Sequence, residues 1–261
     1  MARSIALVTG ASAGIGRAFA ERLAARGDDL VVVARDTARL EVLAKELDST
    51  YGTKVEVLTA DLTTGQGMAA VEARLVDEDR PVDLLVNNAG FGTIGRFHEL
   101  PIAGEITEIG LNVVAVARLT HAGLEGMVRR GRGGVINVAS IAAYQPTPGN
   151  ATYGATKAFV SSLSQAVHEE LKDSPVNCMV LCPGFTRTEF QQRAGIDSTE
   201  VPDFLWQEPS EVVDHALAAF AKGRAVCVPG PLNQATAGFS SVVPATVGRK
   251  IAGLVIRRAE K

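Results

Sequence analysis

Tyr153 and Lys157 form a pair whose residue types and spacing could do chemistry. They lie four positions apart in a segment, from about Asn150 to Leu171, where apolar residues recur at helical spacing, so a helix would present both side chains on one face. A free phenol has a pKa of about 10 and is a poor acid/base group near neutrality. A fixed ammonium nearby favours the phenolate, and we predict that Lys157 lowers the pKa of Tyr153 toward the working range of an acid/base catalyst.

Ser140 is the third candidate of this group. It ends a separate apolar run, Gly134 to Ala139, and its hydroxyl could donate a hydrogen bond to the oxygen on which Tyr153 acts. A Tyr-x-x-x-Lys pair also occurs as an ordinary pair on a helix surface. The assignment therefore depends on the elements that the rest of the chain supplies.

The composition is typical of a globular protein of one domain. The chain has 261 residues, of which 46% are hydrophobic, and its longest apolar runs are too short to span a bilayer. A formal net charge of -3 offers no electrostatic case for nucleic acid. The N-terminus lacks the features of a signal peptide, so we predict a cytoplasmic location. Cys178, Cys182 and Cys227 lie in strand-like segments without metal-ligand spacing, which predicts buried thiols and no metal.

A glycine-rich loop joins the first predicted strand, residues 4–8, to a helix that runs to about Arg26. Glycines also make plain turns, but between a strand and a helix they let backbone N–H groups approach a pyrophosphate at the positive helix end. This order of elements favours nucleotide binding. The candidate residues are Gly10, Ser12, Gly14, Ile15 and Gly16.

Arg35 follows the second predicted strand, Asp29 to Ala34. In dinucleotide folds a carboxylate at this place binds the ribose 2′-hydroxyl, whereas a guanidinium suits a 2′-phosphate. Arg35 therefore predicts NADP(H), with NAD(H) as the alternative. Asp36 leaves the choice open, because its carboxylate could turn toward the ribose, and Arg17 either assists or is a solvated helix residue.

Polar or small residues follow the third and fourth predicted strands, residues 54–60 and 82–86. After the third strand, a carboxylate could accept from an adenine amino group or cap the next helix. After the fourth, amides and small residues can bond backbone groups and leave room for a cofactor. The candidates at these two strand ends are Asp61, Leu62, Asn88, Ala89 and Gly90.

Together these motifs resemble those of the classical short-chain dehydrogenase/reductases. The matching features, in order over about residues 4–190, are Thr9-Gly10-x-x-x-Gly14-x-Gly16, Asn-Asn-Ala-Gly at 87–90, Asn112 in a predicted helix of residues 101–130, Ser140, and Tyr153-x-x-x-Lys157. The resemblance implies a Rossmann-type doubly wound α/β fold with a seven-stranded parallel sheet in the order 3-2-1-4-5-6-7 and helices on both faces. The last three strands would cover residues 135–139, 176–181 and 225–228.

The resemblance also implies roles for individual residues. Tyr153 would exchange a proton with a carbonyl or alcohol oxygen that Ser140 steadies, and Lys157 would bind the nicotinamide ribose. Asn112 would hold a water that links Lys157 to solvent, although a buried amide can also bond its own helix. The residues that would contact the nicotinamide are Pro183, Gly184, Thr186 and Thr188.

The implied activity is the NADP(H)-dependent interconversion of a carbonyl compound and an alcohol by hydride transfer. A small hydrophobic ketone or aldehyde, or a 3-oxoacyl compound, would suit the apolar residues Tyr144, Phe91 and Ile94 and a substrate lid at residues 188–209. The alternative is a protein that keeps this fold only to sense a nucleotide or to serve as a scaffold. The complete catalytic set argues against that alternative, since a sensor does not need the tyrosine–lysine couple.

Residues 243–260 have an apolar residue at every fourth position and several basic residues around it. An amphipathic basic helix of this kind can lie on an anionic membrane, or it can pack on its own domain or on another subunit. We predict packing rather than peripheral membrane contact. The resemblance implies a homodimer or homotetramer.

Overall fold

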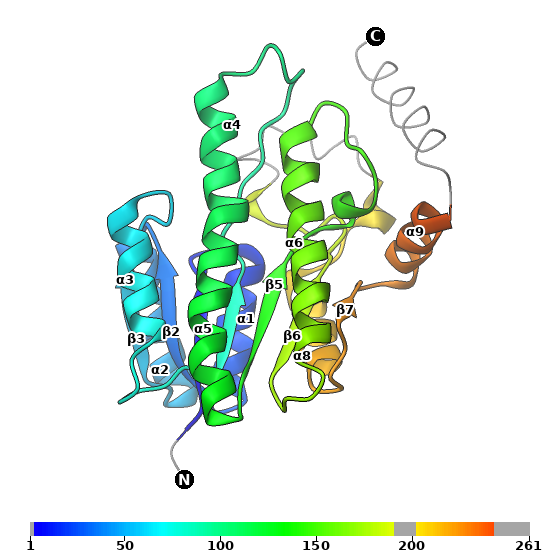
Figure 1. The fold of residues 1–261 in the computed structure, drawn as a ribbon. Coiled ribbons are helices and arrows are strands. Elements are labelled where there is room, and N and C mark those ends of the chain that lie inside the picture. The colour runs from blue at the N-terminus through cyan, green and yellow to red at the C-terminus, as the bar shows by residue number, and fades with distance from the viewer. Residues whose placement is uncertain (1–2, 191–201, 243–261) are drawn as a thin grey trace.

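Seven parallel strands form the centre of this protein in a computed structural model that describes residues 3–190 and 202–242 (Figure 1). The strands are β1 (Ile5–Thr9), β2 (Asp29–Ala34), β3 (Val55–Thr59), β4 (Leu84–Asn87), β5 (Gly134–Val138), β6 (Asn177–Leu181) and β7 (Val226–Cys227). Their order in the sheet is β3-β2-β1-β4-β5-β6-β7, which confirms the predicted topology.

Helices cover both faces of the sheet. They are α1 (Gly14–Ala25), α2 (Thr37–Tyr51), α3 (Gly65–Leu75), α4 (Ile102–Ile109), α5 (Val116–Arg130), α6 (Ala151–Glu170), α8 (Pro209–Phe220) and α9 (Pro231–Val242). One layer consists of α1, α2 and α8, and the other of α3, α5 and α6 (Figure 1). Helix α4 extends beyond the carboxyl ends of the strands, beside the start of α6 (Figure 1).

Two neighbouring residues of β1 show why the strands read as continuous apolar runs. Leu7 packs in the core beneath α3 and α5, whereas Val8 packs in the core beneath α1 and α8, and both are fully buried. Because helices cover both faces, neither set of alternating side chains meets solvent. The register of Leu7 with Val31 and Leu85 extends this burial to β2 and β4.

The carboxyl ends of the strands lie at one edge of the sheet, where the loops of the predicted site begin. Strands β1, β4 and β5 end at Thr9, Asn87 and Val138. Ligands of open parallel sheets bind at this edge, near the place where the strand order reverses. The fold therefore brings the glycine loop, the Asn-Asn-Ala-Gly segment and Ser140 to one side of the molecule.

The long helix predicted for residues 101–130 is interrupted. Between α4 and α5 the chain forms one π-helical segment, Gly110–Ala115, and Asn112 lies fully buried within it. A π-helical turn interrupts the regular α-helical hydrogen bonding and is frequent at functional sites. Here it accompanies an asparagine whose side chain bonds outside its own helix.

Two predicted elements extend outside the described residues. The amphipathic helix at residues 243–260 does so entirely, and the predicted lid does so over residues 191–201. In the part of the chain that the structure describes, no helix combines the length and apolar character needed to cross a bilayer.

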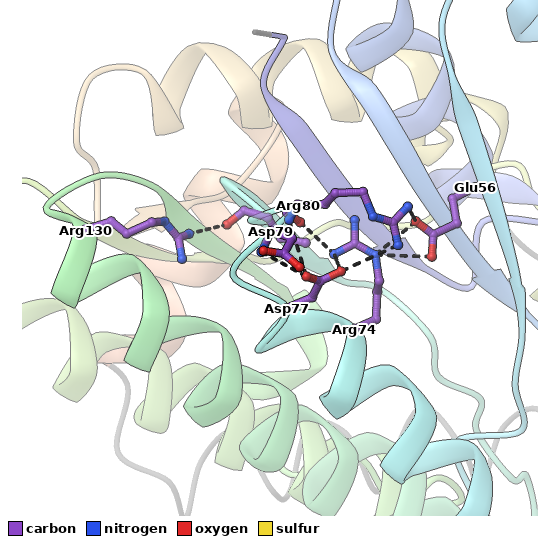
Figure 2. A network of polar contacts seen from close by, with 7 residues as sticks. Glu56, Arg74, Asp77, Asp79, Arg80 and Arg130 are labelled. Atoms are coloured by element: carbon purple, nitrogen blue, oxygen red, sulfur yellow. Dashed lines mark hydrogen bonds and ion pairs between the residues drawn. The ribbon is translucent and has the colours of Figure 1, made fainter.

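A network of ion pairs lies near the amino ends of β3 and β4, at the opposite end of the strands from the predicted site (Figure 2). Arg74 Nε lies 3.0 Å from Glu56 Oε2, and Arg74 Nη1 donates to the carbonyl of Arg80 at 2.8 Å. The Arg80 guanidinium reaches the same Glu56 oxygen at 3.0 Å. The two arginines differ in burial, since the Arg74 side chain is 6% exposed and that of Arg80 is 60% exposed.

We expect Arg74→Leu to lower the free energy of unfolding by about 2–3 kcal/mol, because it leaves partly buried acceptors without their charged donor. Arg80→Leu is the matched control. It removes a guanidinium from the same carboxylate on the solvent side and should cost less than about 1 kcal/mol. Urea denaturation of both variants measures the difference, and equal losses would show that burial does not decide the contribution.

Candidate active site

The glycine loop between β1 and α1 is packed closely against itself and against Asn88. Gly10 has a φ of 66°, in the left-handed region that favours glycine. A Cβ on Gly16 would lie 2.3 Å from the carbonyl oxygen of Gly10 and 2.4 Å from Asn88 Nδ2. Both positions therefore require glycine for the loop to close in this way.

Thr9 holds the segment after β4 beside this loop. Its hydroxyl accepts hydrogen bonds from the backbone N–H groups of Asn88 and Ala89 at 2.9 and 3.0 Å. Asn88 Nδ2 donates to the carbonyl of Thr9 at 3.0 Å. Thr188 reaches the loop from the second half of the chain, since a Cβ on Gly14 would lie 2.9 Å from Thr188 Cγ2.

The start of α1 fits the predicted pyrophosphate. The N-cap residue is Ala13, which supplies no side-chain hydrogen bond to the first turn. The N–H groups of Gly14, Ile15 and Gly16 have no acceptor within the helix, and the helix dipole favours an anion beside them. The half-buried Ser12 precedes this turn. The residues present therefore fit the phosphates of a dinucleotide.

Arg35, at the end of β2, is exposed and makes no hydrogen bond or ion pair with another described residue. The other two candidates at this place have partners in the chain. Asp36 Oδ1 caps α2 by accepting from Arg39 N at 3.1 Å, and Arg17 pairs with Glu21 at 2.8 Å. Of Arg17, Arg35 and Asp36, only the Arg35 side chain makes no hydrogen bond or ion pair with a described residue, so its guanidinium is available to bind a ligand.

Asp61 lies at the end of the third strand, and its Oδ1 accepts from the N–H and the hydroxyl of Thr63 at 3.0 and 2.7 Å. These hydrogen bonds lower the pKa of Asp61, and the charge of Arg35 adds to the effect. Thr64, and not Asp61, is the N-cap of α3. The contact of Asp61 with adenine stays a prediction, as does that of the buried Leu62.

Ser140 and Tyr153 come together from separate elements. Ser140 follows β5 and caps the short 3-10 helix Ile141–Tyr144, where its Oγ accepts from Ala142 N at 3.1 Å. Tyr153 lies in the first turn of α6, which begins within one residue of the predicted start. The Ser140 side chain interacts with the Tyr153 phenol and favours the phenolate.

Lys157 lies beneath the tyrosine ring, with its Nζ 5.5 Å from the ring centroid of Tyr153. It is 4% exposed and donates to the carbonyl of Val138 at 2.9 Å. Desolvation lowers the pKa of Lys157 to about 8. The same effect raises the pKa of Tyr153 to about 12, despite the opposing effect of the Ser140 side chain. The predicted lowering of the Tyr153 pKa by Lys157 is not found, because desolvation of the buried phenol dominates its pKa.

Asn112 ties the loop after β4 to α6. Its Nδ2 donates to the carbonyl of Phe91 at 2.8 Å and to the hydroxyl of Thr156 at 3.1 Å, and its Oδ1 accepts from Phe91 N at 3.2 Å. A Cβ on Gly90 would lie 2.9 Å from Asn112 Oδ1 and 3.5 Å from Lys157 Nζ. Asn112 therefore lies beside Lys157, and its role in holding a water stays a prediction.

The segment after β6 lies next to Ser140. Ile141 N donates to the carbonyl of Pro183 at 2.9 Å, and Thr186 forms an isolated parallel bridge with Gln207. A Cβ on Gly184 would lie 2.5 Å from the side-chain amide of Asn233, so this glycine lets Asn233 pack closely against the segment. The structure thus brings this segment to the same strand edge, while its contact with nicotinamide stays a prediction.

Two buried acids beside this group were missed in the sequence analysis. Glu105 and Glu108 of α4 are 2% and 0% exposed and contact the hydroxyls of Thr93 and Thr152. Their spacing from each other and from Asn112, three and four positions, was the available signal, because it places all three on one helix face.

The three cysteines are free and buried, which confirms the prediction for Cys178, Cys182 and Cys227. Burial raises the pKa of each thiol, to about 12, 11 and 11 respectively, so they are neutral near pH 7. Over residues 3–190 and 202–242, no cluster of His, Cys, Asp and Glu could hold a metal ion.

Comparison with known proteins shows which family and which relatives this chain is similar to. The family model described as short chain dehydrogenase matches residues 4–198. Human 17-beta-hydroxysteroid dehydrogenase type 3 is 32% identical over 243 residues, which cover 92% of this chain and 75% of that protein.

Two solved structures are similar to this chain over most of its length. A short-chain dehydrogenase from Sphingobium yanoikuyae in complex with NADPH has 40% identity and a TM-score of 0.83, covering 92% of this chain and 96% of that one. The bulky-bulky ketone specific alcohol dehydrogenase from Comamonas testosteroni has 35% identity and a TM-score of 0.79, covering 92% and 95%.

Proposed function

Because the chain belongs to the short-chain dehydrogenase/reductase family, we propose that it is an NADP(H)-dependent oxidoreductase that interconverts a hydrophobic ketone or aldehyde and the corresponding alcohol. One observation carries the proposal. Lys157 Nζ lies beneath the Tyr153 ring, and the Ser140 side chain interacts with the same phenol, at the strand edge that also holds the glycine loop.

The chain's residues divide the work between proton transfer and orientation. When bound, NADP(H) supplies or accepts the hydride. In the direction of reduction, Tyr153 gives its proton to the oxygen of the carbonyl group, and the Ser140 hydroxyl donates a hydrogen bond to that oxygen as negative charge develops. Lys157 would bind the nicotinamide ribose, and Asn112 would hold a water beside it.

The preference for NADP(H) rests on Arg35. A guanidinium can bind the 2′-phosphate through charge-assisted hydrogen bonds, and Arg35 makes no hydrogen bond or ion pair with another described residue. The related Sphingobium dehydrogenase, whose structure contains NADPH, supports the same choice.

We expect Arg35→Asp to weaken NADPH binding about 10- to 100-fold, because the lost charge-assisted hydrogen bonds are replaced by repulsion. NADH binding should change much less. Arg26→Asp, an exposed reversal at the other end of α1, is the control for a general change of charge. Titration of cofactor fluorescence with each variant measures both affinities, and equal losses for NADPH and NADH would remove the argument for NADP(H).

The substrate class rests on the apolar residues near the reacting group. The rings of Tyr153 and Phe190 have centroids 5.5 Å apart, and a Cβ on Gly92 would lie 3.0 Å from the Tyr153 ring. Together with Phe91 and Tyr144, these residues would suit a hydrophobic carbonyl compound. The relatives named for hydroxysteroids and for bulky ketones favour the same class.

The decisive experiment follows NADPH absorbance during incubation with a panel of carbonyl compounds. The panel should contain cyclic and steroid ketones, bulky aryl ketones, aldehydes and 3-oxoacyl thioesters. We expect turnover with at least one hydrophobic ketone. Tight NADPH binding without turnover of any member would favour the alternative, a protein that senses a nucleotide or serves as a scaffold.

We further propose that the protein acts as a homo-oligomer. Several large apolar side chains are exposed along α4 and the π-helical segment, and a monomer would leave them in water. They are Ile102, Ile106, Ile109 and Val114.

A further inference from the structure

Two carboxyl groups lie buried behind the tyrosine–lysine couple. Glu105 and Glu108 are one turn apart on α4, and this helix packs against α6, which carries Tyr153 and Lys157. The residues are 2% and 0% exposed. Burying an isolated carboxylate costs free energy, so neighbouring groups must stabilise these two side chains.

The hydrogen atoms around the two acids can be counted. Thr93 Oγ1 lies 2.6 Å from Glu105 Oε1 and 2.8 Å from Glu108 Oε2. A threonine hydroxyl has one hydrogen to donate. Only one of these contacts can therefore use it, and the other requires a proton on a carboxyl group. The geometry implies that the two acids hold one proton between them.

One arrangement of hydrogen atoms satisfies these contacts with Glu108 as the ionised member. Its Oε2 also accepts from Thr93 N at 3.0 Å, and a backbone N–H stabilises a carboxylate. A consistent chain of donors then runs from protonated Glu105 Oε1 to Thr93 Oγ1 and from Thr93 to Glu108 Oε2. The hydroxyl of Thr152 donates to the other oxygen of Glu105. Burial raises the pKa of Glu108, and the charge of the neighbouring Glu105 adds to this effect, so the proton is shared by the pair and not fixed on Glu105 alone.

Glu108 acts on the catalytic couple through space. Its carboxylate favours the ammonium of Lys157 and disfavours the phenolate of Tyr153. The described titratable groups that act on Glu108 are Glu105 on its own helix and Lys157 on α6. Its second oxygen, Oε1, is buried without a hydrogen-bond partner among the described residues, so no donor there neutralises its charge.

We propose that Glu105 and Glu108 share one proton, and that Glu108 is a positioning residue whose charge keeps Lys157 protonated and sets the pH range in which the Tyr153–Lys157 couple works. Only the kinetic consequence rests on the proposed reductase function. The shared proton is a property of the folded chain, and it can be measured without turnover.

Glu108→Gln, which keeps the shape and removes the charge, is the first test. Loss of a nearby negative charge lowers the pKa of both Lys157 and Tyr153. The alkaline limb of kcat/KM for ketone reduction should therefore move by about one pH unit toward acid, whichever of the two groups it reports. Glu105→Gln imitates the protonated member, leaves Glu108 charged and should leave the limb in place. Identical profiles for the wild type and Glu108→Gln would overturn the positioning role.

The second test measures stability against pH and needs no substrate. A carboxyl whose pKa is raised in the folded state adds stability that is fully present below its unfolded value, near pH 4.3, and that is lost as pH rises through its folded value. If the pair holds an extra proton, the wild type should therefore lose stability relative to Glu105→Gln in urea titrations as the pH rises above about 4.3. The exposed Glu41→Gln is the control and should parallel the wild type.

The two readouts separate the hypotheses. If no carbonyl compound is reduced but the wild type and Glu105→Gln diverge with pH, the reductase function fails and the shared proton stands. If both proteins show the same pH dependence of stability, the two acids do not hold an extra proton, and the proposal is overturned whatever the activity.

Discussion

Tyr153→Phe is expected to bind NADPH as the wild type does and to lose about 10²- to 10⁴-fold in kcat for ketone reduction. The substitution removes one oxygen and leaves the ring, whose contact with Phe190 is unchanged. Without the phenol, Ser140 can still donate a hydrogen bond to the substrate oxygen, but the phenolic proton that the mechanism uses is gone. Stopped-flow measurement of NADPH oxidation under single-turnover conditions reports this step directly.

The chain offers a matched control for that variant in Tyr144→Phe. The Tyr144 hydroxyl donates to the buried Cys182 Sγ at 3.7 Å, so its proton is directed to a thiol, and burial raises its pKa as it does that of Tyr153. Removing this second phenol from the same region should change kcat by less than about threefold. A near wild-type rate for Tyr153→Phe, or an equal loss in both variants, would discard the assignment of Tyr153 as the acid.

Lys157→Met is expected to lose activity on a similar scale, about 10²- to 10⁴-fold, and yet to unfold no more easily than the wild type near pH 7. The reason is that the ammonium is buried at a cost. Its pKa is lowered to about 8, against about 10.4 for an exposed lysine, which corresponds to about 3 kcal/mol. Methionine avoids this cost and loses the hydrogen bond to Val138.

The sign of the pH effect on this lysine can be worked out. Between pH 8 and 10 the unfolded chain binds more protons at Lys157 than the folded chain does, so the contribution of this residue to stability rises with pH. The wild type should therefore gain up to about 3 kcal/mol over Lys157→Met across this window. Urea titrations at several pH values measure the difference. A constant difference would show that the lysine has an ordinary pKa in the folded protein.

Much of the fold followed from local pattern. The continuous apolar runs predicted strands that are covered on both faces, and the strand order of the resembling family is the one observed. The start of α6 at Ala151 also agreed, because a small, polar segment precedes a run with helical period. The single helix predicted for residues 101–130 was wrong in one respect, since its composition carries no signal for the π-helical segment around Asn112.

The candidate site, like the fold, could be predicted from the sequence only in part. Residue types and spacing proposed Tyr153, Lys157 and the glycine loop, because i, i+4 geometry and the left-handed conformation of a glycine are local properties. The resemblance of the whole set of motifs to a known family then favoured these residues and Ser140 over an ordinary surface pair. The pairing of Arg17 with Glu46 and the contact of Thr188 with the glycine loop were not foreseeable, because they join segments that are remote in the chain and meet only in the folded protein.

The sequence by itself determined which groups the protein brings to the edge of its sheet: a phenol, an ammonium, a hydroxyl and a glycine cradle. The tertiary structure decided how those groups titrate. Desolvation raises the pKa of Tyr153 and lowers that of Lys157, and the pair Glu105 and Glu108 lies behind them. Burial and the distance between charges depend on segments that are remote in the chain, so the electrostatics of the site exist only after α4 has packed on α6.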